Sequence, residues 1–249
     1  MIPEHVDRRV LGAVRFLDAS TGVDVREPLT VTAPGVRWIR NRAGWYVIAS
    51  APGLDAHVDA FLTPPAAPPL GSVVIALTVR DPGGRYLPRQ HTLRLPRDPD
   101  PLHAAAPGSL FRPIDVALFP APAARTPSGW AVVRASVALV GAAAPVAGAL
   151  VRVARSSDGQ HLASGLSDAR GEVLVPVPGI PLTTSDEGPG PVVATEVEVT
   201  VEVIVDPAAG GVPDPDDLEA RRLALRVAST NVMLAAGREL VASFSIPLP

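Results

Sequence analysis

The stretch that decides the fold runs from Thr195 to Asp206 and reads TEVEVTVEVIVD. Valine occupies every second position from Val197 to Val205, and glutamate or threonine fills most of the positions between. A period of two places all these valines on one face of a strand, whereas a helix would scatter them around its axis. Valine is β-branched and favours strands in its own right. The stretch therefore predicts a half-buried β-strand.

The same alternation continues through the chain. Residues 222–227 and 240–246 alternate with period two, and further strand-like runs occupy residues 10–16, 36–40, 45–48, 73–80, 132–140, 149–155 and 172–177. Gly, Pro, Asp and Ser separate these runs, as in antiparallel β-sandwiches. One helix is expected, at residues 214–220, where Asp214 is an N-cap type residue followed by a proline. The fold class predicted is all-β, with antiparallel β-sandwiches.

Composition bounds the size and excludes several classes of protein. The chain has 249 residues, of which 47% are hydrophobic, enough for one large domain or two smaller ones. It has 29 prolines and 21 glycines, which indicates many turns, and no cysteine, which excludes disulfides, thiolate zinc sites and cysteine nucleophiles. All the basic residues are arginine, yet the net charge is −3, so no nucleic-acid partner is expected.

A proline-rich stretch near the middle of the chain predicts two tandem domains. We expect an N-terminal β-sandwich at residues 1–119, a Pro-rich linker at residues 120–129 and a C-terminal β-sandwich at residues 130–249. Alternating prolines favour extended polyproline geometry, so the linker is expected to be a semi-rigid spacer. The two halves also echo each other. Residues 14–22 align with residues 151–159, and in each half a later turn, strand and Pro-Gly follow.

No membrane span is expected. The longest apolar run, residues 137–151, contains Pro145 and is shorter than the roughly 20 residues that a spanning helix needs. The first residues lack the basic and apolar regions of a signal peptide. The expectation is cytoplasmic synthesis without a signal peptide. Export as part of a particle, either released or attached to a membrane, is left open.

The second half carries a recognisable order of motifs. A strand at residues 149–153 is followed by Ser157-Asp158-Gly159, then by a Ser-Asp-x-x-Gly hairpin within residues 165–175. This order resembles the carboxypeptidase-regulatory-like and transthyretin-like β-sandwich domains, over residues 130–247. Residues 234–240, which lead into the Phe244 strand, fit the last hairpin of that family. The resemblance implies a domain without catalytic residues that spaces, docks or stiffens a larger assembly.

Three segments of the first half, residues 14–22, 41–48 and 80–88, resemble Ig-like modules of proteins in bacterial phage-tail-like contractile injection particles. This resemblance implies a non-catalytic structural or adaptor protein at the spike, baseplate or cap of such a particle. Its partners would be other proteins of a multi-subunit assembly, and it would need no cofactor. Homo-oligomerisation is left open.

The strongest candidate for a partner interface is the run RWIRNRAGWY at residues 37–46. It contains Arg37, Trp38, Arg40, Arg42 and Trp45, and arginine and tryptophan are enriched at interface hot spots. On a strand, Trp38 and Arg40 would share one face, and Arg37 would lie on the other. In the alternative interpretation one of the tryptophans fills the core and the arginines are solvated.

Other sites are weaker in the sequence. No histidine pair has metal-ligand spacing, and His57 is interpreted as a loop residue beside a turn aspartate. The carboxylates of residues 214–219 suit either calcium or a solvated turn that starts a short helix. Ser167 lacks the second glycine of a nucleophile elbow and is assigned to a hairpin turn.

Two alternative functions remain. A surface or carbohydrate-binding module would need an exposed aromatic platform, for which the chain offers three tryptophans and two tyrosines. An accessory protein of a hydrolase, with an active site of its own, would need a pocket where His57, His91 or His161 meets carboxylates or arginines.

Overall fold

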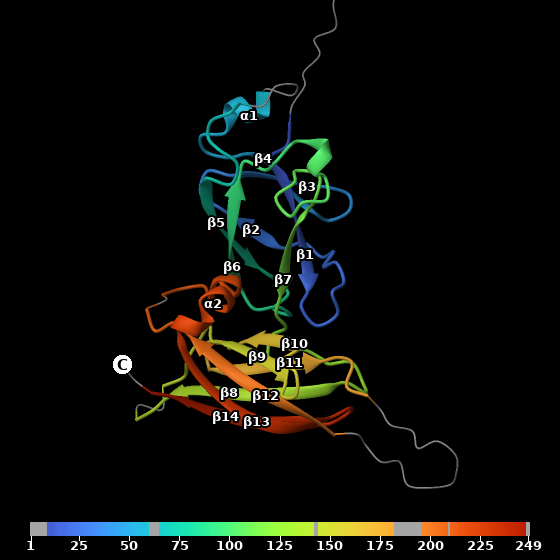
Figure 1. Cartoon of the computed structure of the whole chain (residues 1–249), viewed down its shortest axis with the longest axis vertical. Coiled ribbons are helices and arrows are strands. Elements are labelled where there is room, and N and C mark those ends of the chain that lie inside the picture. Colours follow the sequence, from blue (N-terminus) through green and yellow to red (C-terminus); the bar gives the residue numbers. More distant parts are fainter. Residues whose placement is uncertain (1–8, 60–64, 142–143, 182–195, 209, 248–249) are drawn as a thin grey trace, which may run out of the picture. The chain divides into compact units, whose positions relative to one another are not determined.

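The structure is a computed structural model that describes residues 9–59, 65–141, 144–181, 196–208 and 210–247. These residues form an almost entirely β chain (Figure 1). The strands are β1 (Gly12–Asp18), β2 (Thr30–Thr32), β3 (Arg37–Arg40), β4 (Tyr46–Ser50), β5 (Val73–Arg80), β6 (Arg89–Leu95), β7 (Ile114–Leu118), β8 (Ala131–Leu139), β9 (Leu150–Arg155), β10 (His161–Leu166), β11 (Glu172–Val177), β12 (Glu196–Val205), β13 (Arg226–Ala235) and β14 (Glu239–Ile246). The helical elements are α1 (Asp55–Asp59), α2 (Pro215–Ala220) and the 3-10 turns η1 (Pro101–His103) and η2 (Arg222–Ala224).

The chain divides into two compact units. The first comprises Met1–Leu17, Val23–Pro82 and Arg89–Ala117, and the second comprises Asp18–Gly22, Gly83–Pro88 and Leu118–Pro249. Two short segments from the first half of the sequence thus group with the second unit. The boundaries at residues 119 and 130 that the sequence suggests remain a proposal.

The first unit contains two sheets, ordered β3-β4-β1-β7 and β2-β5-β6. Each sheet buries alternate side chains, such as Leu77 and Val79 on β5 and Val14 and Phe16 on β1. Tyr46 on β4 is buried with them, and its ring packs edge-on against Phe16 with centroids 5.5 Å apart. A buried aromatic ring with a polar tip needs a partner for its hydroxyl. The Tyr46 hydroxyl accepts from the Leu29 amide at 2.7 Å and donates to the Leu29 carbonyl at 2.8 Å.

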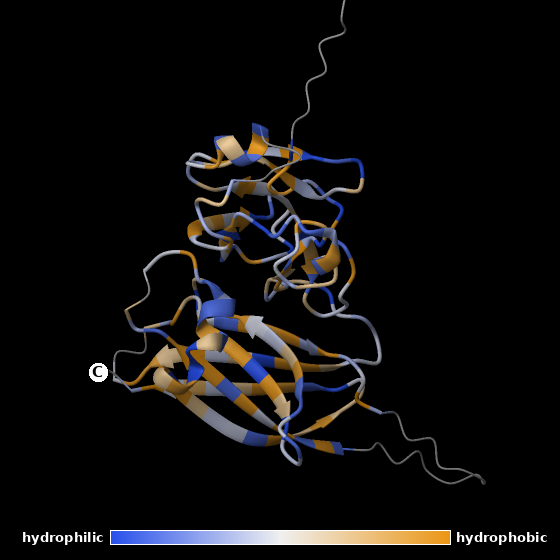
Figure 2. Cartoon of the chain, turned by 45° about the horizontal axis from the view of Figure 1, so that its top comes forward, coloured by the Kyte–Doolittle hydropathy of each residue, from blue (hydrophilic) through white to orange (hydrophobic). Residues whose placement is uncertain are grey.

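The second unit is a β-sandwich. Its two sheets are ordered β10-β9-β12-β13 and β11-β8-β14, and one hydrophobic core draws side chains from all seven strands. Valine dominates that core, and Val199, Val201 and Val203 of β12 have no exposed surface. Figure 2 shows hydrophobic and hydrophilic positions alternating along the strands of this unit. The β8–β14 pair is parallel, with Glu239 opposite Val132 and Ile246 opposite Leu139, and so departs from the antiparallel pairing expected.

Most of the predicted strands are present, and the all-β class is confirmed. β5 and β11 have the predicted bounds, and β12 covers the deciding stretch from Glu196 onward. The strand predicted at residues 222–227 is wrong, because its first half is the turn η2 and Leu223 is 94% exposed. The strand there, β13, begins at Arg226 and pairs with β12 at ten successive positions. The helix predicted at residues 214–220 is confirmed as α2.

The predicted internal repeat is visible in the turns. Asn41 and Asp168 each accept, through the side-chain oxygen, a hydrogen bond from the amide four residues later, at 2.9 and 3.0 Å. Gly44 and Gly171 then complete the two turns with positive φ, and each donates to the carbonyl three residues back. The first turn joins the paired strands β3 and β4. The second joins β10 and β11, which belong to different sheets and meet at the isolated bridge between Ser167 and Val173.

The proline-rich stretch after Phe119 differs from the extended spacer that its prolines predict. The Ala121 amide donates to the Arg85 carbonyl at 2.8 Å, and the Leu87 amide donates to the Phe119 carbonyl at 2.9 Å. A turn then closes between Ala121 and Ala124. Hydrogen bonding to residues 85–87 within the second unit has replaced free polyproline geometry here.

Candidate protein-interaction surface

β3 forms one edge of its sheet and carries much of the predicted interface. It pairs with β4 on one side, and among the described residues no strand follows on the other side. The register shifts between Arg37 and Trp38, so that Arg37 lies opposite Ser50 while Trp38 lies opposite Ile48. Edge strands expose one row of backbone donors and acceptors that another chain can pair with.

Trp38 and Arg40 share a face of the sheet, as the sequence predicts. They lie opposite Ile48 and Tyr46, whose side chains point into the core. Trp38 is only partly buried, yet its indole nitrogen is shielded from solvent and has no hydrogen-bond partner among the described residues. A shielded N–H without an acceptor costs free energy.

Trp45 belongs to a separate cluster on the other face of the sheet. Its indole nitrogen donates to Asp24 Oδ2 at 3.2 Å, and the Arg15 guanidinium lies 5.7 Å from its ring centroid. Arg15 in turn holds Asp115 through two hydrogen bonds of 2.7 and 2.8 Å, and the hydrogen bond to Asp115 raises the pKa of Arg15. A cation over an indole ring and a bidentate carboxylate pair are mutually supporting. Trp45 is therefore held in place by its own neighbours.

The arginines around β3 have few partners. Arg37 and Arg42 are exposed, and neither forms an ion pair with a described residue. Arg40 donates through Nη2 to the Arg26 carbonyl, and Arg26 likewise has no described carboxylate partner. Arg37 and Arg40 thus lie on the edge strand and Arg42 in the turn that follows it, without a compensating acid in the described part of the chain. This edge carries positive charge although the whole chain is slightly acidic.

Neither tryptophan occupies the centre of the core, because Tyr46 fills it instead. The structure brings Trp38 and Arg40 together, leaves Arg37 and Arg42 beside them on the exposed edge, and separates Trp45 from all four. Sequence analysis missed Arg15, Asp24 and Asp115, which lie in other segments and meet Trp45 only through sheet pairing and the turn after β1. Their use as an interface remains a proposal.

The carboxylates of residues 214–219 act as structural groups. Asp214 caps α2 by accepting from the amides of Asp216 and Asp217, and Arg221 pairs with Asp217. Glu219 lies 3.3 Å from Arg152 and 3.8 Å from Arg222. In the described residues, no group of three or more His, Asp or Glu side chains is arranged to hold a metal ion. The helix-start interpretation therefore accounts for this cluster.

Ser167 is also structural, and its hydroxyl is fully used. The side chain is 4% exposed, accepts from the Ala149 amide at 2.7 Å and donates to the Val146 carbonyl at 2.7 Å. These bonds tie the end of β10 to the start of β9. Ser167 itself lies just before the hairpin turn expected for it, which begins at the next residue, Asp168.

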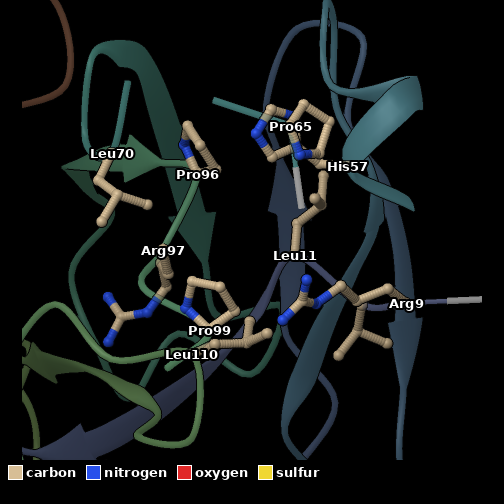
Figure 3. A pocket seen from close by; sticks show the side chains of 10 residues that line it. Arg9, Leu11, His57, Pro65, Leu70, Pro96, Arg97, Pro99 and Leu110 are labelled. Carbon is tan, nitrogen blue, oxygen red and sulfur yellow. The ribbon is translucent and has the colours of Figure 1, made fainter. Parts of the chain in front are cut away.

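A cavity in the first unit has no counterpart in the predicted sites. It has a volume of about 200 Å³ and is lined by Arg9, Val10, Leu11, His57, Pro65, Leu70, Pro96, Arg97, Pro99 and Leu110 (Figure 3). His57 lies on α1, so its interpretation as a loop residue is wrong. Its side chain is 5% exposed, and its Nδ1 atom has no hydrogen-bond partner among the described residues. A histidine beside two arginines meets part of the requirement for an active site, but the described residues of the lining include neither a carboxylate nor a hydroxyl nucleophile.

Comparisons with known proteins give only remote likenesses. No family model and no curated protein matches the chain. Among solved structures, the Bacillus anthracis TIE protein aligns at 8% identity and a TM-score of 0.30, over 96% of this chain and 34% of its own length. The minor pilin GBS52 of Streptococcus agalactiae aligns at 9% identity and a TM-score of 0.28, over 84% of this chain and 67% of its own.

A third structure, the shaft pilin SpaA from Lactobacillus rhamnosus GG, aligns at 12% identity and a TM-score of 0.28. That alignment covers 71% of this chain and 66% of the pilin chain. This chain spans about a third of the length of the TIE protein chain. Neither helix in the described ranges has the length and hydrophobicity for a membrane crossing. The strands and compact units of this chain establish by themselves that it is an all-β protein with two units.

Proposed function

We propose that this chain is a non-catalytic structural or adaptor protein that binds another protein along the β3 edge. The observation that carries the proposal is the set of three arginines on or just after an open strand edge, Arg37, Arg40 and Arg42, that lack a described carboxylate partner. An acidic, extended segment of a partner is the chemistry that fits. Its backbone would pair with β3, and its carboxylates would meet the arginines.

The same charges explain how the edge discriminates between partners. Two copies of this chain would bring like charges together if their β3 edges paired, and like-charge contacts across an interface cost on the order of several kcal/mol. Charged edges are one way in which β-proteins avoid pairing with themselves. An acidic partner would relieve the repulsion.

The proposal also names the kind of assembly to which the chain belongs. The segment resemblances in the first half support a phage-tail-like contractile injection particle, with the chain at the spike, baseplate or cap. The comparisons with known proteins do not bear on that assignment. A multi-subunit particle nevertheless suits a chain whose strongest surface feature is an unpaired edge.

The test is co-sedimentation from the source organism. Wild-type protein should travel with a particle of megadalton size, and cross-linking mass spectrometry should join the β3 edge to an acidic segment of a neighbour. The R37E/R42E double variant should shift to the fraction of free protein, because charge reversal replaces attraction by repulsion. R94E is the matched control, since Arg94 is an exposed arginine on β6 of the same unit.

The purified variants must have the same urea midpoint as wild type, so that loss of assembly is not loss of folding. The proposal fails if R37E/R42E still co-sediments as wild type does. It fails equally if wild-type protein sediments as a free monomer or dimer.

A further inference from the structure

We propose that the cavity beside α1 binds a small organic acid, a monocarboxylate with a short apolar body. The walls supply the two kinds of surface that such a molecule needs. Leu11, Leu70 and Leu110, together with three prolines, form the apolar part. Arg9 and His57 bring nitrogen atoms to the rim or the wall, and Arg97 lines the cavity with its guanidinium turned away (Figure 3). Ligand sites are commonly apolar clefts with a few convergent polar groups.

The described residues that line the cavity include cations but no carboxylate. Arg97 is partly buried, and its guanidinium donates to the carbonyls of Pro107 and Ser109, at 2.8 Å and at 2.7 and 2.9 Å, and to that of Arg112 at 3.2 Å. Carbonyl oxygens accept these bonds without cancelling the charge. Burial lowers the pKa of Arg97, and the nearby charge of Arg112 lowers it further, as expected where positive potential is uncompensated.

Arg9 adds a second positive charge at the cavity. Its backbone amide donates to the Val58 carbonyl of α1 at 3.0 Å, which fixes the residue beside the helix that carries His57. Its side chain forms no ion pair with a described residue. In Figure 3 the Arg9 guanidinium is directed toward Pro99, while Arg97 lies on the opposite side of the cavity with its guanidinium turned away.

His57 supplies the second donor. Its side chain is almost fully buried, yet its Nδ1 atom has no partner among the described residues. Buried ring nitrogens without a partner are uncommon because they lose their bonds to water. A carboxylate oxygen in the cavity would accept from His57 in the tautomer that carries hydrogen on Nδ1, and its second oxygen would accept from Arg9.

The volume sets the size of the ligand. About 200 Å³ lies below the range of roughly 300–1,000 Å³ that is typical of drug-sized ligands. At roughly 30 Å³ for each liquid water molecule, the space equals that of several waters and suits a molecule of benzoate or hexanoate size. A nucleotide or an oligosaccharide would be too large.

The experiment titrates the full-length protein with benzoate and with benzamide, its neutral analogue of the same shape, at constant ionic strength. Benzoate should move the ¹⁵N resonances of the His57 ring and bind at least roughly tenfold more tightly than benzamide, since charged hydrogen bonds are the stronger ones. R9Q should weaken benzoate binding by about tenfold and leave benzamide unchanged. R94Q is the control and should alter neither.

Three results would overturn the proposal. Benzamide could bind as tightly as benzoate, which would make the cavity merely apolar. Benzoate and hexanoate could both fail to move the His57 resonances at millimolar concentration, which would show that the cavity binds neither acid. R94Q could weaken benzoate binding as much as R9Q does, which would reveal a general effect of surface charge. None of these results depends on whether the β3 edge binds a protein.

Discussion

Single glycines decide whether the repeated turns can form. A Cβ atom at Gly171 would lie 2.3 Å from the Val137 carbonyl oxygen, and this residue has φ +74°. Its own carbonyl accepts from the Val137 amide at 2.8 Å, so the two strands approach each other closely at this point. Gly159 has a similar φ of +70°, but nothing lies within 4 Å of its ideal Cβ position. The two glycines therefore separate the cost of backbone conformation from the cost of crowding.

We predict that G171A lowers the free energy of unfolding of the second unit by about 3 kcal/mol or more, because strain and collision add. G159A should cost only about 1–2 kcal/mol, the usual penalty for a left-handed alanine. Urea denaturation measures both values. Equal losses in the two variants would contradict the crowding that the structure shows at Gly171.

Two histidines should titrate on opposite sides of their ordinary pKa of 6.5. A hydrogen bond of 2.7 Å to Asp98 raises the pKa of His103, and Asp100 adds to the shift. Burial lowers the pKa of His161, and the charge of Arg152 lowers it further. The stability that His103 contributes is complete below pH 6.5 and is lost as pH rises through its raised pKa. The neutral His161 loses stability in the other direction, as pH falls below 6.5.

Proton NMR titration of the histidine ring resonances tests this order. His103 should have the higher midpoint, and D98N should lower that midpoint toward 6.5 while leaving His161 unchanged. A midpoint of His103 that does not move in D98N would contradict the assigned cause.

At the level of elements, periodicity predicts strands whose buried face is uniformly apolar and fails where a polar residue stands at an inward position. β12 alternates cleanly because Val199 and Val201 enter the core while Glu198 faces outward. β13 is harder to recognise, because Ala228, Val232 and Leu234 face the core but the exposed Thr230 interrupts their alternation. The sequence pattern did not predict β6, for another reason. It begins with Arg89, which is fully buried and donates to the carbonyls of Gln90 and Ala117.

The candidate surface was predictable only in part, for a related reason. Residues 37–45 are contiguous, so composition could single them out. The separation of Trp38 from Trp45 depends on which residue points into the core, and Tyr46 takes that place through its hydroxyl bonds to Leu29. The cavity could not be found in this way, because Arg9, His57 and Arg97 come from three distant segments.

The short helix α2 offers a prediction about an element. Asp214 caps its first turn, and Leu218 anchors it in a cluster with Leu150, Leu166 and Ile204. D214A should lower the free energy of unfolding of the second unit by about 1 kcal/mol, the typical value of an N-cap. D214N should restore most of that loss, because asparagine caps nearly as well.

Urea midpoints measure the difference between the two variants. Calcium at millimolar concentration should leave both midpoints unchanged, since the nearby carboxylates already hold arginines and backbone amides. A loss in D214N equal to that in D214A, or a rise in stability with calcium, would contradict the capping role.

At the scale of the whole molecule, each unit has its own hydrophobic core, so each unit has its own free energy of unfolding. Leu77 has no exposed surface in the first unit, and Leu174 has none in the second. Tryptophans report on each unit separately, since Trp38 and Trp45 belong to the first and Trp130 to the second. Replacing the tryptophans of one unit by phenylalanine leaves a fluorescence signal that comes from the other unit alone.

We propose that the units unfold as separate transitions, and this leads to the last prediction. L77A should lower the free energy of unfolding reported by Trp38 and Trp45 by about 2–5 kcal/mol, the range for a leucine removed from a packed core, and leave the Trp130 transition in place. L174A should do the reverse. Because the chain has no cysteine, the measurement is unaffected by oxidation of thiols. If both signals shift together in either variant, the chain unfolds as one cooperative body, and separate unfolding of the two units must be given up.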